Sequence, residues 1–139
     1  MLEKIRFSLI NKTKQEIPHG YFLSVLKNFL KKMGIKNPIE VNLILVGNAY
    51  MRSLNKKYRK IDKPTDVLSF PIDIINPKKI PKAGIIILGD IYICPELVET
   101  QNFASLQKTF LHGLIHLIGY DHEKNKKEWE KVLKKLSAK

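Results

Sequence analysis

The amino-acid sequence predicts a small α+β fold in which a mixed β-sheet packs with helices. Segments typical of strands and segments typical of helices follow one another without the regular strand–helix–strand order of an α/β protein. The strongest strand signal is the apolar run at 84–93, and amphipathic stretches at 18–33 and 124–136 indicate helices. The length of 139 residues is typical of one domain, which we expect to span residues 1–139.

The first half of the chain is expected to form two strands and two helices. Residues 4–10 resemble a short strand, and residues 40–46 alternate as a half-buried strand does. Residues 18–33 are predicted to be helical because apolar side chains recur there at helical spacing. These side chains are Phe22, Val25, Leu26, Phe29 and Leu30. Asn48 is a candidate N-cap for the next helix, which is expected to reach Tyr58.

The second half is expected to contain two more strands, followed mostly by helix. A short strand at 67–72 ends at a proline, and a basic loop at 74–82 leads into the buried strand named above. Pro95 suits the first turn of a helix. Helix is expected to continue to Gly119, with a break near Ser105.

The charge balance is strongly basic, with 25 Lys+Arg against 13 Asp+Glu and a net charge of +12. This balance is typical of a protein that binds a polyanion such as nucleic acid. A general lysine bias would produce the same balance, since 22 of the 25 basic residues are lysine. In the last helix, 124–136, we expect the lysines on a solvated face, with the apolar side chains inward. Those are Trp129, Val132, Leu133 and Leu136.

The cysteine content and the hydropathy pattern indicate where the protein works. One cysteine, Cys94, excludes an internal disulfide and suits a reducing compartment. Its apolar neighbours suggest a small core residue rather than a nucleophile. No apolar run approaches the roughly 18 residues of a membrane span, and the N-terminus lacks the apolar region of a signal peptide. We expect a cytoplasmic protein without a membrane partner.

Three histidines and a glycine near the C-terminal end are the most informative residues: His112, His116, Gly119 and His122. His112 and His116 are four residues apart, so they share one face of a helix. Gly119 can end that helix in the left-handed conformation, which would let the chain turn back and bring His122 to the same point. Three imidazoles with an open fourth position form a catalytic zinc site, and we predict one here.

A pair of histidines at this spacing is often only structural, but the neighbouring residues favour a metal site. Apolar side chains cover nearly every other direction around the helix, which predicts that the helix is buried. They are Phe110, Leu111, Leu114, Ile115, Leu117 and Ile118. Buried imidazoles need partners because an unpaired buried polar group costs roughly 1–3 kcal/mol, and a shared metal ion supplies one.

The histidine spacing is that of the metzincin proteases, with one departure. In those enzymes the general-base glutamate follows the first histidine, whereas this chain has Gly113 there. No methionine follows His122, so the methionine turn of those proteases is missing as well. Peptide hydrolysis is therefore not expected.

A second block of chemically informative residues runs from Arg59 to Pro71. Arg59 is one of three arginines in the chain. Arginine can bind a phosphate through two parallel hydrogen bonds, which favours a functional role. A surface ion pair with Asp62 or Asp66 is the alternative, and the sequence alone supports both equally.

Taken together, these segments resemble the YbeY family of bacterial metal-dependent endoribonucleases and ribosomal RNA maturation factors. The matching residues keep the order and spacing of the family. They are Asn55, Tyr58-Arg59, Thr65-Asp66-Val67-Leu68-Ser69-Phe70-Pro71, Leu88-Gly89-Asp90-Ile91 and the whole His112–His122 motif.

The resemblance implies a zincin-like fold, one zinc ion per chain held by His112, His116 and His122, and a functional role for Arg59. It implies a single-strand-specific endoribonuclease that acts in 3′-end maturation of small-subunit (16S) ribosomal RNA and in ribosome quality control. The expected partners are ribosomal RNA, the small ribosomal subunit and its assembly factors, without DNA. We expect the protein to be a monomer.

Cleavage of a phosphodiester is compatible with the missing glutamate. Zinc lowers the pKa of a bound water to about 7, and Arg59 would stabilise charge that grows on the phosphoryl oxygens. Asp66, Asp90 and Asp121 are candidates for proton transfer or for orienting a ligand. Two alternatives stay open at this point. One is a ribosome-assembly RNA-binding factor with structural zinc, and the other is a metallohydrolase with a non-RNA substrate such as a peptide.

Overall fold

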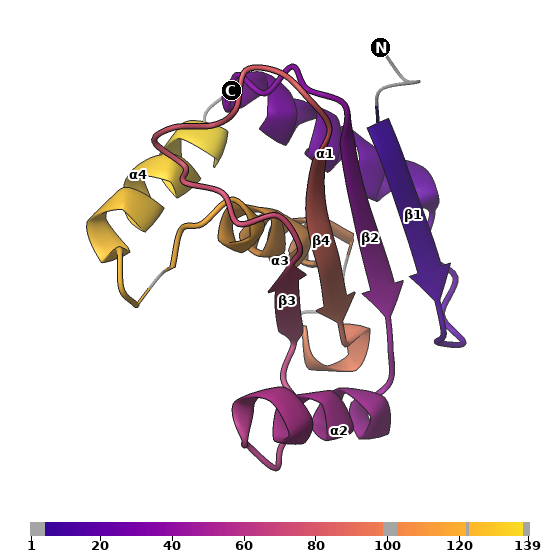
Figure 1. Ribbon diagram of the computed structural model, residues 1–139. Helices are drawn as coiled ribbons and strands as arrows, with labels where there is room; N and C mark the ends of the chain where they lie inside the picture. The colour runs from indigo at the N-terminus through magenta and orange to yellow at the C-terminus, as the bar shows by residue number, and fades with distance from the viewer. Residues whose placement is uncertain (1–4, 99–102, 122, 138–139) are drawn as a thin grey trace.

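A computed structural model describes residues 5–98, 103–121 and 123–137 of the chain (Figure 1). In chain order, its elements are β1 (Ile5–Asn11), α1 (His19–Lys32), β2 (Ile39–Leu45), α2 (Asn48–Arg59), β3 (Val67–Pro71), β4 (Ile86–Ile93), the short 3₁₀ helix η2 (Pro95–Leu97), α3 (Phe103–Leu117) and α4 (Lys126–Ser137). This mixture of one sheet and four helices confirms the predicted α+β class.

The four strands form one mixed sheet in the order β1-β2-β4-β3. β1 pairs with β2 in parallel, β2 pairs with β4 in parallel, and β3 runs antiparallel to β4 as an edge strand. The parallel pair β1 and β2 is connected through α1, so the chain begins with a strand–helix–strand unit that the sequence pattern did not reveal. A register shift between Glu40 and Val41 interrupts the pairing of β2 with β4.

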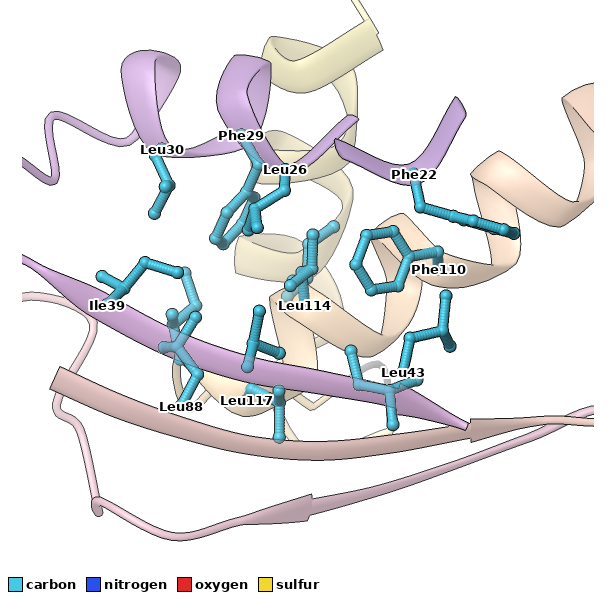
Figure 2. Close-up of a cluster of buried hydrophobic side chains, with 14 of the residues drawn as sticks. Phe22, Leu26, Phe29, Leu30, Ile39, Leu43, Leu88, Phe110, Leu114 and Leu117 are labelled. Carbon is cyan, nitrogen blue, oxygen red and sulfur yellow. The ribbon is translucent and has the colours of Figure 1, made fainter. Parts of the chain in front are cut away.

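The main hydrophobic core lies between one face of the sheet and helices α1, α3 and α4. Figure 2 shows Phe22 and Leu26 of α1 above Leu43 of β2, with Phe110 and Leu114 of α3 beside them. Trp129, Val132 and Leu136 of α4 are buried in the same core, as predicted. This arrangement fixes α3 against β3 and β4, on the β3 side of the sheet.

A smaller core lies on the other face of the sheet, where α2 covers one end (Figure 1). It contains the buried residues Ile44, Val46, Met51, Leu68 and Cys94. The burial of Cys94 confirms its interpretation as a small core residue. Among the helices that the structure describes, none has the length and apolar character that crossing a membrane would need.

A 3₁₀ helix starts at Pro95, which agrees with the prediction that Pro95 suits the first turn of a helix. Two details differ from the sequence-based prediction. The predicted break near Ser105 is wrong, because Ser105 lies inside the continuous helix α3. Asn48 does not cap α2, because Gly47 is the N-cap residue and no side-chain cap hydrogen bond is made there. The Asn48 side chain instead accepts a hydrogen bond from the Cys94 thiol at 3.1 Å.

Candidate functional site

His112 and His116 lie on successive turns of α3, which packs directly against β3 and β4. Gly113 lies at this contact: a Cβ atom there would approach Cγ2 of Ile91 to 2.8 Å and Cδ1 to 3.0 Å. The Ser69 hydroxyl of β3 donates to the Gly113 carbonyl at 3.5 Å. A glycine therefore allows the helix to approach the sheet, and a glutamate at this position would have to displace Ile91.

The end of α3 explains the glycine at position 119. The backbone N–H of Gly119 donates to the carbonyl of His116 at 3.0 Å, and that of Tyr120 donates to the carbonyl of Ile115 at 3.3 Å. These two bonds form a Schellman motif, which requires a positive φ at its glycine, and Gly119 has φ 107°. The chain turns away from the helix axis here, as the sequence predicted. His122, the third predicted ligand, lies outside the described residues.

Helix α4 contacts His112 and His116 through the ring of Trp129. The Trp129 ring lies 4.8 Å from the His116 ring and 5.6 Å from the His112 ring, measured between centroids. Oδ1 of Asp121 accepts the backbone N–H groups of Glu123 and Lys124 at 2.7 and 3.1 Å, so this carboxylate caps the turn that leads into α4. The ligand-orienting role considered for Asp121 stays a prediction.

The chemistry of these donors suits a zinc ion. His112 and His116 place two imidazoles next to one tryptophan, and zinc is commonly bound by imidazole nitrogen. Within residues 5–98, 103–121 and 123–137, no group of three His, Cys, Asp or Glu side chains is placed to hold a metal ion. A complete three-histidine site therefore depends on His122.

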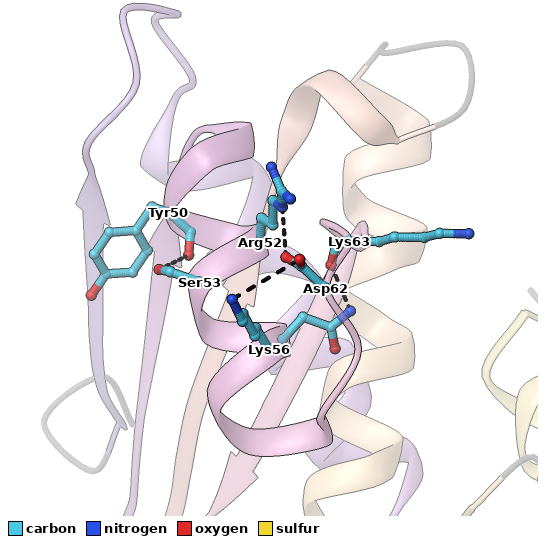
Figure 3. A network of polar contacts seen from close by, with 7 residues as sticks. Tyr50, Arg52, Ser53, Lys56, Asp62 and Lys63 are labelled. Carbon is cyan, nitrogen blue, oxygen red and sulfur yellow. Dashed lines mark hydrogen bonds and ion pairs between the residues drawn. The ribbon is translucent and has the colours of Figure 1, made fainter.

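Arg59 lies in the last turn of α2, where the helix ends with Lys60 in the left-handed conformation at φ 62°. The buried side chain of Asn55 donates to the Lys63 carbonyl at 2.8 Å and ties the following loop back to the helix. The carboxylate of Asp62 is bound by Arg52 at 2.7 Å, as Figure 3 shows. The hydrogen bond from Arg52 lowers the pKa of Asp62.

Of the two roles considered for Arg59, an ion pair with Asp62 is wrong, because Asp62 pairs with Arg52 and, at 4.0 Å, with Lys56. Among the described residues, no ion pair of Arg59 with Asp66 is found either. The Arg59 guanidinium is exposed. It is therefore available to a ligand.

A cleft of about 680 Å³ brings the two sequence motifs together. Arg59 from α2 and His116 from α3 both line it, although they are far apart in the chain. Asp66 and Asp121 line it as well. Asp90 does not, because it lies on the other face of the sheet, where its carboxylate accepts a hydrogen bond from Asn42 at 2.9 Å.

The cleft also contains polar residues to which the sequence analysis assigned no role. They are Thr65, Ser69, Tyr120, Glu123 and Asn125. The first two lie inside the motif that begins at Arg59, so their position in that block was a signal. The last three line the cleft because the chain turns back after Gly119, so their position just after that glycine was the signal.

Comparisons with known proteins match almost the whole chain. The family model described as endoribonuclease YbeY matches residues 8–139. A protein of Mycolicibacterium smegmatis named endoribonuclease YbeY is 32% identical over 130 residues, which cover 86% of this chain and 73% of that protein. A protein of Mycobacterium tuberculosis strain H37Rv with the same name is equally similar, at 32% identity over 130 residues.

The comparison with solved structures also finds similar folds. The solution structure of TM1509 from Thermotoga maritima matches this chain with a TM-score of 0.54 and 25% sequence identity. The match covers 95% of this chain and 88% of that one. The likeness therefore extends over the sheet, the helices and the cleft region together.

Proposed function

Because the chain belongs to the endoribonuclease YbeY family, we propose that it is a zinc-dependent endoribonuclease that cuts single-stranded RNA. Its substrate would be small-subunit (16S) ribosomal RNA, processed at the 3′ end, and it would also act in ribosome quality control. Its partners would be the small ribosomal subunit and its assembly factors, in the cytoplasm. We further propose that it acts as a monomer with a zincin-like arrangement of α3 and the sheet.

The observation that carries this proposal is the shared cleft of Arg59 and His116. Arginine binds phosphate oxygens through a cationic, two-pronged contact, and Arg59 is exposed and not engaged by Asp62. Lys124 also lines the cleft. Lys56, Lys57 and Lys60 line a neighbouring hollow of about 580 Å³ on α2. RNA would thus meet positive charge on its way to the histidines.

Zinc would be held by His112, His116 and His122. When bound there, it would supply Lewis acidity at the phosphate and a source of hydroxide near neutral pH. The Arg59 guanidinium would bind the phosphoryl oxygens and stabilise the charge that grows on them. The carboxylate of Asp66 faces the same cleft and could accept a proton from the attacking group.

The metal assignment predicts one zinc ion per chain. Purified protein should contain about one equivalent of zinc, as four-coordinate sites of this ligand type do. His112→Ala, His116→Ala and His122→Ala should each lose most of it, measured by elemental analysis. His19→Ala should keep it, because His19 is on α1 and packs on Phe7. Full zinc content in any of the three histidine variants would remove that residue from the site.

The activity is tested by incubating wild type and His116→Ala with single-stranded RNA, with zinc content measured on the same samples. We expect cleavage by wild type and none by His116→Ala. The product termini separate two routes: attack by water leaves a simple monoester, and attack by the ribose 2′-hydroxyl leaves a cyclic phosphate. Tight RNA binding without cleavage by zinc-loaded wild type would instead favour an assembly factor with structural zinc.

A metallohydrolase acting on peptides is the other alternative. The contact between Gly113 and Ile91 disfavours it, because the position of the protease glutamate has no room for a side chain. Wild type should leave casein intact. Robust casein cleavage that disappears in His116→Ala would overturn the RNA assignment.

A further inference from the structure

Four aromatic side chains form a continuous row on the sheet face opposite α3. The ring centroids of Tyr50 and Tyr92 are 6.3 Å apart and the rings are stacked. Tyr92 and Phe70 meet edge to face at 5.6 Å, and Phe70 and Tyr58 do so at 5.0 Å. We call Tyr50, Tyr92, Phe70 and Tyr58 the aromatic row.

The row is built by two elements of the fold. Tyr50 and Tyr58 lie in the first and last turns of α2, at helical spacing that places them on one side of the helix. Phe70 lies next to Ser69, whose hydroxyl points to α3, so the Phe70 ring points to the opposite face of the sheet. Tyr92 is on the neighbouring strand and contacts Phe70 on that same face.

The two ends of the row are open to solvent and carry positive charge. Tyr58 is 55% exposed and Tyr50 is 42% exposed. The ammonium group of Lys57 lies 5.2 Å from the Tyr58 ring, and that of Lys12 lies 4.9 Å from the Tyr50 ring. Figure 3 shows the Tyr50 ring on the side of α2 away from Lys63. Phe70 and Tyr92, between these two ends, are half-buried.

The row also begins next to the cleft. Tyr58 directly precedes Arg59, which lines the cleft. β3 is an edge strand, so an RNA strand bound in the cleft can pass around β3 to reach Phe70 on the other face of the sheet. A flexible single strand can make this turn, whereas a stiff duplex cannot.

We propose that the aromatic row is a stacking platform for the bases of single-stranded RNA whose phosphodiester occupies the cleft. The inference rests on the proposed function and adds a second binding surface to it. Every base has an aromatic face that can stack on a tyrosine, and the adjacent phosphates would meet Lys57 and Lys12. Asp90 pairs with Phe70 across β3 and β4, and its carboxylate already accepts a hydrogen bond from the Asn42 amide.

The test compares two RNAs that differ only in their bases. One is a single-stranded oligoribonucleotide of about 12 nucleotides, long enough to extend from the cleft along the row, and the other is its abasic counterpart with the same phosphates. Binding of each is measured by fluorescence anisotropy for wild type and for Tyr50→Leu/Tyr58→Leu. Leucine keeps the apolar contact with the sheet and removes the ring. Cleavage of a dinucleotide, which holds only the scissile phosphodiester, is measured in parallel.

We expect the double variant to bind the base-bearing RNA at least about five-fold more weakly, because stacking on one aromatic ring typically contributes that much or more. Its affinity for the abasic RNA and its cleavage of the dinucleotide should equal those of wild type. The matched control is Tyr21→Leu, since Tyr21 is also 42% exposed but stacks on Phe103 in the helical layer. This control should bind both RNAs normally.

Three results would overturn the platform. They are an unchanged affinity for base-bearing RNA, an equal loss on both RNAs, and an equal loss in the Tyr21→Leu control. An unchanged affinity would instead favour a protein partner as the ligand of the exposed row. If the double variant does not fold, Tyr58→Leu alone replaces it. A wild type that does not cut any RNA would refute the proposed function, whereas a wild type that cuts normally while the double variant binds normally would refute only the platform.

Discussion

At the scale of single residues, α2 offers a natural comparison between two arginines. Arg52 is bound to Asp62, whereas Arg59 faces the cleft. Arg59→Ala should therefore reduce RNA cleavage by two or more orders of magnitude, as expected when a donor that stabilises transition-state charge is removed. Zinc content and thermal stability should stay unchanged, because the side chain is exposed.

Arg59→Lys should restore only part of the activity, because lysine cannot form the two-pronged contact. The matched control is Arg52→Ala, which removes an equal charge from the same helix. It should cost little activity and little stability, since exposed ion pairs contribute roughly 0–1 kcal/mol. Wild-type rates in Arg59→Lys would mean that Arg59 acts only as a positive charge.

The buried thiol of Cys94 and the half-buried phenol of Tyr92 make a prediction about alkaline pH. Burial raises the pKa of the Cys94 thiol and, on β4, the pKa of the Tyr92 phenol. In the unfolded chain these groups ionise near their usual pKa values of about 8.5 and 10, whereas in the folded protein they lose their protons at higher pH. The folded state thus binds more protons in this range, and the free energy of unfolding should fall as the pH rises through it.

Urea unfolding at pH 7 and at about pH 9.5 checks this pH dependence, which should be weaker in Cys94→Ala. Native protein should also react slowly with iodoacetamide and rapidly in urea, because Cys94 is 0% exposed. Rapid labelling of the native protein would contradict the buried position of the thiol.

At the scale of elements, the contact between α3 and β4 depends on Gly113. Gly113→Ala should lower the free energy of unfolding by about 1–3 kcal/mol, because the added methyl group overpacks the contact with Ile91. The higher helix propensity of alanine, about 1 kcal/mol, offsets only part of this loss. Urea denaturation measures the net effect. Zinc affinity and cleavage should fall as well, since α3 carries His112 and His116.

Gly20→Ala in α1 is the matched control, because nothing lies within 4 Å of a Cβ at that position. This change should be neutral or slightly stabilising. If both substitutions had the same effect, the close approach of α3 to the sheet would not be the reason for glycine at position 113.

At the scale of the whole molecule, the net charge of +12 predicts binding to RNA that weakens steeply with salt. Each phosphate contact to a single strand contributes roughly 0.7 to the slope of log affinity against log salt. Replacing the exposed lysines next to Arg59 with glutamine should weaken RNA binding and make that slope less steep. These residues are Lys56, Lys57, Lys60 and Lys63.

The control is a second set of exposed lysines on α4, made up of Lys131, Lys134 and Lys135. Its neutralisation should change affinity and slope less, since these residues lie on α4, whereas the first set flanks Arg59. Titrations at several salt concentrations measure both sets. Equal losses would mean that the positive charge acts diffusely, without a preferred path for RNA beside α2.

The sequence by itself determined much of this protein. Apolar periodicity located every strand and most helix bounds, because a buried face imposes a period of about 2 or 3.6 residues on the chain. The two motifs pointed to the family, and Gly119 indicated where α3 ends. The exceptions, at Asn48 and Ser105, concern element ends, where few residues carry the signal.

Only the tertiary structure decided how these parts meet. No local pattern shows that Arg59 and His116 line one cleft, that Trp129 packs on the histidines, or that Asp62 engages Arg52. The first two contacts join segments that are distant in the chain, so they follow from strand order and helix packing. The third depends on which of two arginines in α2 lies nearer to Asp62, and the sequence contains both. The same physical reason applies to the aromatic row, whose four rings come from a helix and two strands and become a surface only when the sheet assembles.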